Sequence, residues 1–333
     1  AAVSRIGFTI SAAVAKIFLE RGVILLARVS VVMPLYNAEK FLELSVQSVL
    51  QQTFKDFELI LVEDCSTDGT LAAAENFDDA RITILRNEKN LGTPGATRNV
   101  GLDAAQGEYV YFMDDDDVLL ERGLEILVDA AEKNSADAVN ASKWYESQNL
   151  DASSADEIKL DLQRMQSSAV SEDLQTRIYQ EFLRGGMHIA PWLFLYRREF
   201  LLANGIKFPA EAAEDVFFNF DVICATGKIV KVDEPFYIWR AYTDSTTRNP
   251  ARLAKNLQSI LKLHAHISEK LSPLGDAEFT ADVLKFWTRH TLRSYVLPIL
   301  QRKSQEEISQ ALAPAFAQNA PFVATLLQLY AQK

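Results

Sequence analysis

Short apolar runs rich in β-branched residues alternate with longer amphipathic stretches between residues 29 and 141. The apolar runs predict strands at 29–33, 59–63, 82–85, 109–113 and 138–141, and the amphipathic stretches predict helices at 38–52, 70–77 and 96–105. Such alternation is typical of repeated βαβ units. We therefore expect an α/β fold with a Rossmann-like, mostly parallel sheet flanked by helices.

The rest of the chain follows other patterns. Residues 146–176 are rich in Ser, Asp, Gln and Glu with little periodicity, which predicts an exposed excursion without regular structure. Beyond Asn249-Pro250, apolar residues return at helical spacing over 251–271 and 277–297. We therefore expect an N-terminal helical extension (1–28), a sheet-bearing domain (29–249) and a helical C-terminal domain (250–333).

Charge and cysteine content narrow the class of protein. The formal net charge of −11 argues against a nucleic-acid partner, because nucleic-acid-binding proteins neutralise phosphates with a basic face. Cys65 and Cys224 lie far apart, without the spacing of a zinc site or a disulfide framework, so a reducing, cytoplasmic setting is expected. The uncharged run at 6–15 is shorter than the ~20 apolar residues that span a bilayer.

Four adjacent aspartates, Asp114 to Asp117, follow the strand predicted at 109–113. Such a run is either a solvated acidic turn or a site where a hard divalent cation offsets the mutual repulsion. Its place at the carboxyl end of a strand favours the cation site, because ligands of open α/β sheets bind at that edge. Asp114 and Asp116 can face the same way in an extended stretch, and Mg²⁺ or Mn²⁺ suits their oxygen ligands.

A second pair of acids, Glu63 and Asp64, ends the strand predicted at 59–63. Asp64 is suited to accept a hydrogen bond from a nucleobase N–H, whereas Asp68 is better suited to cap the helix that starts at Thr70. The chain has neither a GxxxxGK[ST] loop nor a GxGxxG after its first strand. Because these two phosphate-binding motifs are absent, the sequence does not favour a kinase, an ATPase or a dehydrogenase.

Four segments follow one another at compatible spacings: Val31-Val-Met-Pro34-Leu-Tyr36-Asn37, Val62-Glu-Asp64-Cys-Ser-Thr-Asp68-Gly69, Gly95-Ala-Thr-Arg98-Asn99-Val-Gly101 and Gly107-Glu-Tyr-Val-Tyr-Phe-Met-Asp114-Asp-Asp116-Asp117. In this order they resemble glycosyltransferase family 2 over most of residues 29–120. The resemblance implies a GT-A-type catalytic domain at 29–249 and an inverting transfer of a sugar from a nucleotide diphosphate sugar. Glu63 and Cys65 depart from the pattern, because the family more often has Asp and Gly there.

The same resemblance implies roles for individual residues. It places six residues at the donor: Pro34, Tyr36 and Asn37 beside the nucleotide, Asp64 at the base, Arg98 at the ribose or phosphates, and Asp114 near the ribose or sugar. Asp116 would hold the metal. Asp117 would assist either task or cap a helix that begins near Leu120. Asp115 receives no role.

Downstream, Phe208-Pro-Ala-Glu-Ala-Ala-Glu214-Asp215 resembles the Glu-Asp motif of the family's acceptor side, where the aspartate is the general base. Taken alone, an acid pair at the start of an apolar helix is more often a partner of the helix dipole. Together with the upstream segments, it makes Asp215 the predicted base and Glu214 an acceptor-side candidate.

Three further residues are candidates, and two of them, Arg240 and His188, have two interpretations each. Arg240, in Tyr237-Ile-Trp-Arg240, is either a bidentate phosphate contact or an ordinary strand residue. His188 is more often a packing residue in such an apolar stretch than a ligand. Trp192 beside it is a candidate to stack against an acceptor sugar.

The resemblance implies transfer of a hexosyl or N-acetylhexosaminyl group, with a UDP-sugar as the preferred donor. By family resemblance, the acceptor is a saccharide or a lipid-linked saccharide in bacterial surface polysaccharide or lipooligosaccharide synthesis. A nucleotidyltransferase or sugar pyrophosphorylase would need a basic Gly-rich loop near the first strand, which the chain lacks. A non-catalytic scaffold with a helical interaction tail would not need Asp64, Asp116 and Asp215.

The tail also leaves alternatives open. Residues 308–332 carry no charge, and Pro314 and Pro321 exclude one continuous membrane span. Such a segment most often packs on its own domain, but it also suits pairing into a homo-oligomer or contact with a membrane surface. The expected location is cytoplasmic, with peripheral contact at the inner face of the membrane as the alternative.

Overall fold

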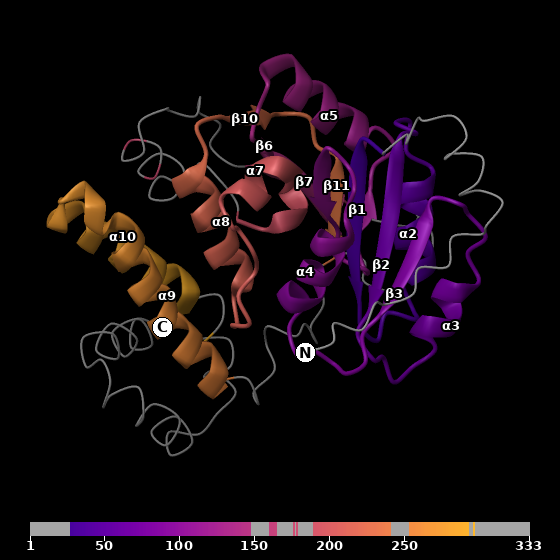
Figure 1. The fold of residues 1–333 in the computed structure, drawn as a ribbon, viewed down its shortest axis with the longest axis horizontal. Helices are drawn as coiled ribbons and strands as arrows, with labels where there is room; N and C mark the ends of the chain where they lie inside the picture. The colour runs from indigo at the N-terminus through magenta and orange to yellow at the C-terminus, as the bar shows by residue number, and fades with distance from the viewer. Residues whose placement is uncertain are drawn as a thin grey trace, which may run out of the picture.

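A computed structural model describes residues 27–147, 160–164, 176, 178, 189–240, 253–292 and 296 (Figure 1). Its strands are β1 (Val29–Leu35), β2 (Phe57–Glu63), β3 (Ile82–Arg86), β4 (Tyr109–Phe112), β5 (Val118–Leu119), β6 (Ala138–Ala141), β7 (Lys143–Ser147), β8 (Leu160–Arg164), β9 (Phe194–Arg197), β10 (Ile229–Val232) and β11 (Tyr237–Arg240). Its helices are α2 (Leu42–Leu50), α3 (Thr70–Glu75), α4 (Pro94–Ala104), α5 (Gly123–Asn134), η3 (Pro191–Leu193), α7 (Arg198–Ala203), α8 (Glu214–Ala225), α9 (Leu253–Leu271), η6 (Ser272–Leu274) and α10 (Ala277–Thr291).

The central sheet has seven strands in the order β10-β6-β9-β4-β1-β2-β3. All neighbouring pairs are parallel except those of β9, which runs antiparallel to both β4 and β6. A second sheet of four strands has the order β5-β11-β7-β8. The predicted fold class, a mostly parallel α/β sheet flanked by helices, is confirmed.

Helix α4 lies against β1 and β2, and Gly101 makes this close approach feasible. A Cβ at Gly101 would come within 2.3 Å of Cγ1 of Val32, so a side chain there would push the helix off the sheet. The buried apolar cluster of the sheet continues into α9 and α10 through Leu263, Ile267 and Trp287. In Figure 1, α9 and α10 lie on the side of α8 that faces away from β1, β2 and β3.

The five strands predicted from the sequence are present, and several helix boundaries differ from the prediction. The helix expected from residue 38 begins at Leu42, because Asn37 has a positive φ of 54° and the next residues form a turn closed by the Phe41 N–H on the Ala38 carbonyl. The helix expected from residue 96 begins earlier, at Pro94, because Thr93 caps it by accepting from the Ala96 N–H.

The expectation of an excursion without regular structure at 146–176 was wrong in part. Strand β7 continues to Ser147, and β8 pairs with it antiparallel over Lys143–Ser147 and Leu160–Arg164. Residues 1–26 and the apolar tail at 308–332 lie outside the described residues, so their predicted roles stay predictions, as does the division at 28/29 and 249/250. Among the helices in the described part of the chain, none combines the length and apolar character that crossing a membrane requires.

Candidate active site

The candidate site lies at the carboxyl edge of β1 and β4, which are neighbours in the sheet. From β1 the chain continues to β2 and β3 on one side, whereas β4 lies on the other, so the strand order reverses between β1 and β4. Such a reversal leaves a crevice where ligands of open α/β sheets bind. Tyr36 and Asn37 follow β1, and the four aspartates follow β4.

Three of the aspartates converge. One carboxylate oxygen from each of Asp114, Asp116 and Asp117 lies within 4.8 Å of the other two. We name these three residues the acidic cluster. Burial, followed by the charges of Asp116 and Asp114, raises the pKa of Asp117 well above its ordinary value. A divalent cation would offset this unfavourable charge, and an all-oxygen set is one that Mg²⁺ and Mn²⁺ accept, so the residues fit the predicted metal.

Asp117 is held by strand β11. Its Oδ2 accepts from the Tyr237 hydroxyl at 2.7 Å, and its Oδ1 accepts from the Arg240 backbone N–H at 2.7 Å. Of the two alternatives for Asp117, the helix cap near Leu120 was wrong, because α5 begins at Gly123 with Arg122 as its N-cap. Sequence reasoning missed the role of Tyr237, for which the only sequence signal is the short aromatic run at 237–240.

Asp115, which received no role from the sequence, joins the two strands of the site. Its Oδ2 accepts from the Tyr36 N–H at 3.0 Å. Burial and the neighbouring charge of Asp116 raise the pKa of Asp115 well above its ordinary value. Tyr36 as a whole is 51% exposed, so its aromatic side chain is a candidate surface for a planar ligand.

The end of β1 is shaped by Pro34 and Asn37. The Val32 carbonyl accepts from the Met113 N–H, so the backbone of Val32, and that of Pro34 two residues later, faces β4. Pro34 lies beyond the last β1–β4 pair, Val32–Phe112, so the N–H that proline lacks is not needed for strand pairing there. Asn37 accepts from the Thr67 N–H at 2.8 Å. These contacts tie the loop after β1 to the loop after β2.

Asp64 is 4% exposed and organises the loop after β3. Its Oδ1 accepts from Asn87 Nδ2 at 2.7 Å, and both of its oxygens accept from the Leu91 N–H, at 3.0 and 3.1 Å. Its predicted contact with a base stays a prediction. Asp68 lies one residue before Gly69, the N-cap of α3, and accepts from the Thr70 N–H at 3.0 Å, so it holds the helix start from just outside the cap position.

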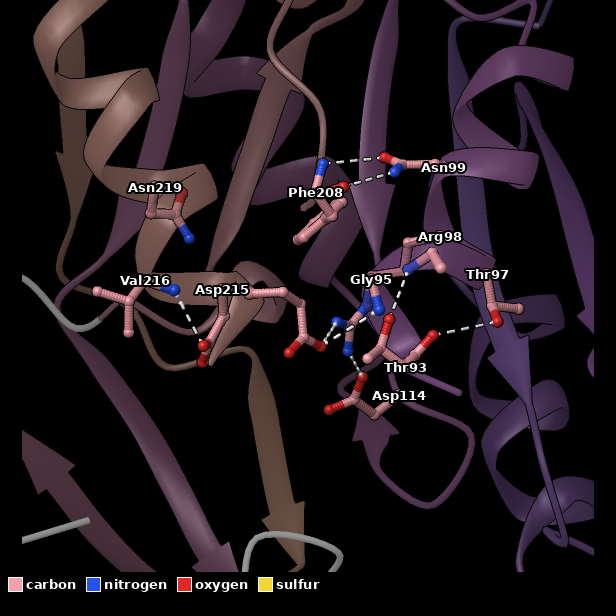
Figure 2. A network of polar contacts seen from close by, with 12 residues as sticks. Thr93, Gly95, Thr97, Arg98, Asn99, Asp114, Phe208, Asp215, Val216 and Asn219 are labelled. Atoms are coloured by element: carbon pink, nitrogen blue, oxygen red, sulfur yellow. Dashed lines mark hydrogen bonds and ion pairs between the residues drawn. The ribbon is translucent and has the colours of Figure 1, made fainter. Parts of the chain in front are cut away.

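The predicted base, Asp215, is in the first turn of α8, with Oδ1 accepting from the Val216 N–H at 2.9 Å. Glu214 beside it accepts from the Gly95 N–H at 3.2 Å. Arg98 is ion-paired with both Glu214 and Asp114, so the acidic cluster and the start of α8 are joined through one guanidinium (Figure 2). Arg98 and Glu214, which are 116 residues apart in the chain, are thus brought together at the site.

The remaining candidates differ in how they are placed. The Arg240 side chain is 3% exposed, and its Nε and Nη2 have no hydrogen-bond partner among the described residues, which leaves a buried cation suited to an anion. Trp192 is 5% exposed and stacks on Tyr237 at 4.5 Å between ring centroids, so its burial gives no support to stacking on a sugar. His188 lies outside the described residues.

Comparison with known proteins adds to this geometry. A sequence model described as Glycosyl transferase family 2 matches residues 30–203. An uncharacterized glycosyltransferase EpsJ of Bacillus subtilis is 30% identical over 249 residues, which cover 72% of this chain and 70% of that protein. The UDP-Glc:alpha-D-GlcNAc-diphosphoundecaprenol beta-1,3-glucosyltransferase WfgD of Escherichia coli is 40% identical over 107 residues, which cover 32% of this chain and 42% of that protein.

A solved structure shares the fold. S. aureus TarS 1-349, crystallised in complex with UDP-GlcNAc, superposes with a TM-score of 0.67 at 22% identity, covering 90% of this chain and 81% of that chain. At this level of identity the match shows a common fold, and the GT-A-type architecture implied by the sequence segments is confirmed.

Proposed function

The chain belongs to glycosyltransferase family 2, and from this premise we propose that it transfers a sugar from a UDP-sugar to a hydroxyl of a saccharide or lipid-linked saccharide, with inversion at the anomeric carbon. The observation that carries the proposal is the meeting of the acidic cluster with the Glu214–Asp215 turn at one edge of the sheet. A transferase needs a cation that stabilises the leaving diphosphate and a base for the acceptor; the acidic cluster is the candidate to hold the cation, and Asp215 is the candidate base.

Residues of the first two strand ends support a nucleotide on the donor side. The exposed Tyr36 ring offers a stacking surface, and Pro34 and Asn37 shape the loop beneath it. Asp64 is the candidate for a hydrogen bond to the base, and the buried Arg240 guanidinium is the candidate for a phosphate. A UDP-sugar is preferred because WfgD, a relative that is 40% identical over 107 residues, carries UDP-glucose in its name.

Asp116 would hold Mg²⁺ or Mn²⁺, with Asp114 and Asp117 close enough to share it. When bound, the ion would supply positive charge to offset the charge that develops on the leaving diphosphate. Asp117 also keeps the cluster in place, because both of its oxygens accept hydrogen bonds from β11.

Asp215 is the proposed general base. The acceptor oxygen attacks the anomeric carbon from the face opposite the diphosphate, the bond between that carbon and the leaving oxygen breaks, and its electron pair stays on the diphosphate. The proton of the acceptor hydroxyl passes to the Asp215 carboxylate. Proton acceptance of this kind contributes on the order of a hundred- to ten-thousand-fold to the rate.

The proposed acceptor is supported by the name of a relative, and the proposed location follows from that acceptor. WfgD has a diphosphoundecaprenol-linked acceptor in its name, and an acceptor of this type would bring the present enzyme to the inner face of the membrane as a peripheral protein. Glu214, Trp192 and His188 stay the acceptor-side candidates, and the segment after residue 250 stays the candidate for membrane contact or for pairing with a second copy.

The test is metal-dependent release of nucleoside diphosphate from UDP-glucose, UDP-N-acetylglucosamine and GDP-mannose. Asp116→Ala should abolish release and weaken donor binding, whereas Asp215→Asn should lower turnover about a hundred-fold or more with donor binding retained. Asp221→Asn is the matched control, because Asp221 lies on the same helix but pairs with His266 and Lys270. Absence of both binding and turnover with every donor would contradict the proposal and favour a scaffold.

A further inference from the structure

The side chain of Arg98 lies between carboxylates that come from two sides of the site (Figure 2). Its Nη2 is ion-paired with Asp114 of the acidic cluster, and its Nη1 lies 3.4 Å from Oε1 of Glu214, the first residue of α8. We propose that Arg98 is a positioning residue, which ties Asp114 to the start of α8 and so fixes the place of Asp215. The proposal rests on the proposed function, because it takes Asp215 as the base.

Other contacts of α4 hold the same segment. The Gly95 N–H donates to the Glu214 carboxylate, and the Asn99 side chain bonds both the N–H and the carbonyl of Phe208, at 3.0 and 2.7 Å (Figure 2). A Cβ on Gly95 would come within 2.4 Å of the Glu214 Cγ and 2.8 Å of the Phe208 Cβ, so glycine permits this approach. The first two turns of α4 thus hold the chain from Phe208 to Glu214.

Arg98 is badly placed to serve a donor phosphate, the role that the family resemblance implies. Its side chain is 6% exposed, and both terminal nitrogens are engaged by carboxylates. Burial alone would lower the pKa of Arg98, but the charges of Asp114, Glu214 and Asp215 raise it, so the guanidinium keeps its charge. The positive charge of Arg98 is already neutralised by these carboxylates, so it does not need a diphosphate as its counter-ion.

The start of α8 needs this support. The residue before the helix, Ala213, has a positive φ of 58°, and no side chain caps the helix. On the α9 side, the Ala212 N–H donates to Ser259 Oγ at 2.9 Å, and on the α4 side Arg98 holds Glu214. A misplacement of ~1 Å can cost about a hundred-fold in rate. Loosening the Arg98 contact should therefore slow turnover without weakening the binding of the donor.

Arg98→Lys is the first variant, because lysine keeps the charge but its single ammonium cannot span two carboxylates as the planar guanidinium does. Hydrolysis of UDP-glucose or UDP-N-acetylglucosamine with Mn²⁺, with water as the acceptor, gives kcat, and titration with UDP gives Kd. We expect kcat to fall about 10- to 100-fold with Kd within about threefold of the native value. Arg197→Lys is the control, since Arg197 bridges Glu108 and Tyr109 at the opposite end of β4.

Glu214→Gln tests the other end of the bridge and decides the matter if Arg98→Lys does not fold. The amide can still accept from Gly95 but no longer pairs with the guanidinium as an ion. Its kcat for hydrolysis should fall as in Arg98→Lys, and the double variant should be no slower than the worse single one. A tenfold or larger rise in Kd with kcat retained in Arg98→Lys, or independent effects in the double variant, would overturn the proposal.

Hydrogen exchange separates failure of this proposal from failure of the proposed function, because it needs no turnover. Exchange of the amides at 208–216 should quicken in Arg98→Lys and Glu214→Gln but not in Arg197→Lys. Unchanged exchange in both variants would show that the bridge does not hold α8, whatever the native protein turns over. If exchange quickens in the variants but the native protein releases no nucleoside diphosphate, the contact between Arg98 and the start of α8 is supported and only the proposed reaction is contradicted.

Discussion

Asp117 is buried with both carboxylate oxygens bonded to β11, while Asp114 and Asp116 beside it are only half-buried. The three aspartates therefore differ in burial and in hydrogen bonding, although they belong to one run of adjacent aspartates in the sequence. A carboxylate held from behind by a tyrosine hydroxyl keeps one orientation, and a metal site depends on such supporting contacts for its affinity. Tyr237 is the side chain that supplies this contact, and Trp192 stacks on its ring.

Tyr237→Phe should therefore weaken metal binding. The change removes the O–H donated to Asp117 and leaves the ring packing in place, so the expected loss is about tenfold or more in Mn²⁺ affinity, measured by titration without donor. Tyr196→Phe is the matched control, because its buried hydroxyl donates to Asn219 at 2.8 Å and not to an aspartate of the acidic cluster. Equal Mn²⁺ affinity in both variants would show that Tyr237 does not support the site.

Single-residue roles were predictable where they follow from strand ends. The convergence of Asp114 and Asp116 was predictable, because residues two apart in an extended stretch can face the same way. The bond of Tyr36 to Asp115 and the anchoring of Asp117 by Tyr237 were not predictable. The second of these contacts depends on a short strand that pairs with β5 more than a hundred residues away, and no local pattern fixes such a pairing.

At the scale of elements, the long buried strands β1 and β2 were found from their apolar runs, because a parallel strand covered on both faces reads as a continuous hydrophobic stretch. Strand β9 was not found, because it follows η3 directly and continues directly into α7, so no turn signal marks either of its ends. Helices α9 and α10 were found from their spacing, but the sequence did not show that they share the sheet's core.

The packing of α9 against α10 makes stability depend on pH. Burial lowers the pKa of His264, which contacts the Thr288 hydroxyl, from 6.5 to about 4. Between these two pH values, His264 binds a proton in the unfolded chain but not in the folded protein. The free energy of unfolding should therefore fall as pH drops from about 6.5 towards 4, by at most on the order of 3 kcal/mol. Above pH 6.5, His264 should have no effect on the pH dependence of stability.

His264→Gln should reduce this loss, because the amide does not titrate. The measurement is the midpoint of denaturant unfolding at pH 7.5 and pH 5.0 for each protein. Ala265→Gln places the same side chain at the exposed neighbouring position and should keep the native pH dependence. If His264→Gln loses as much stability as the native protein between the two pH values, the protonation of His264 is not the cause.

At the scale of the whole molecule, the topology gathers charge that the chain as a whole already carries in excess. The net charge of the chain is −11. Six of its acidic residues lie together at the sheet edge: the acidic cluster, Asp115, Glu214 and Asp215. Arg98 and Arg240 are the buried cations described at this edge, and Arg98 is engaged by Asp114 and Glu214. Repulsion of this kind costs folding free energy, and a bound cation would offset it.

Mn²⁺ or Mg²⁺ should therefore stabilise the whole fold. A ligand that binds only the folded protein adds RT ln(1 + [L]/Kd), which is about 2.7 kcal/mol at a concentration of 100 Kd, and the unfolding temperature should rise by several degrees. Asp116→Ala should remove this rise, whereas Asp103→Ala, which deletes an exposed carboxylate paired with Lys207, should keep it. Matching the ionic strength with KCl separates specific binding from general screening of the net charge. A rise that persists in Asp116→Ala would place the cation outside the acidic cluster, because the carboxylate assigned to the metal would then contribute nothing to its binding.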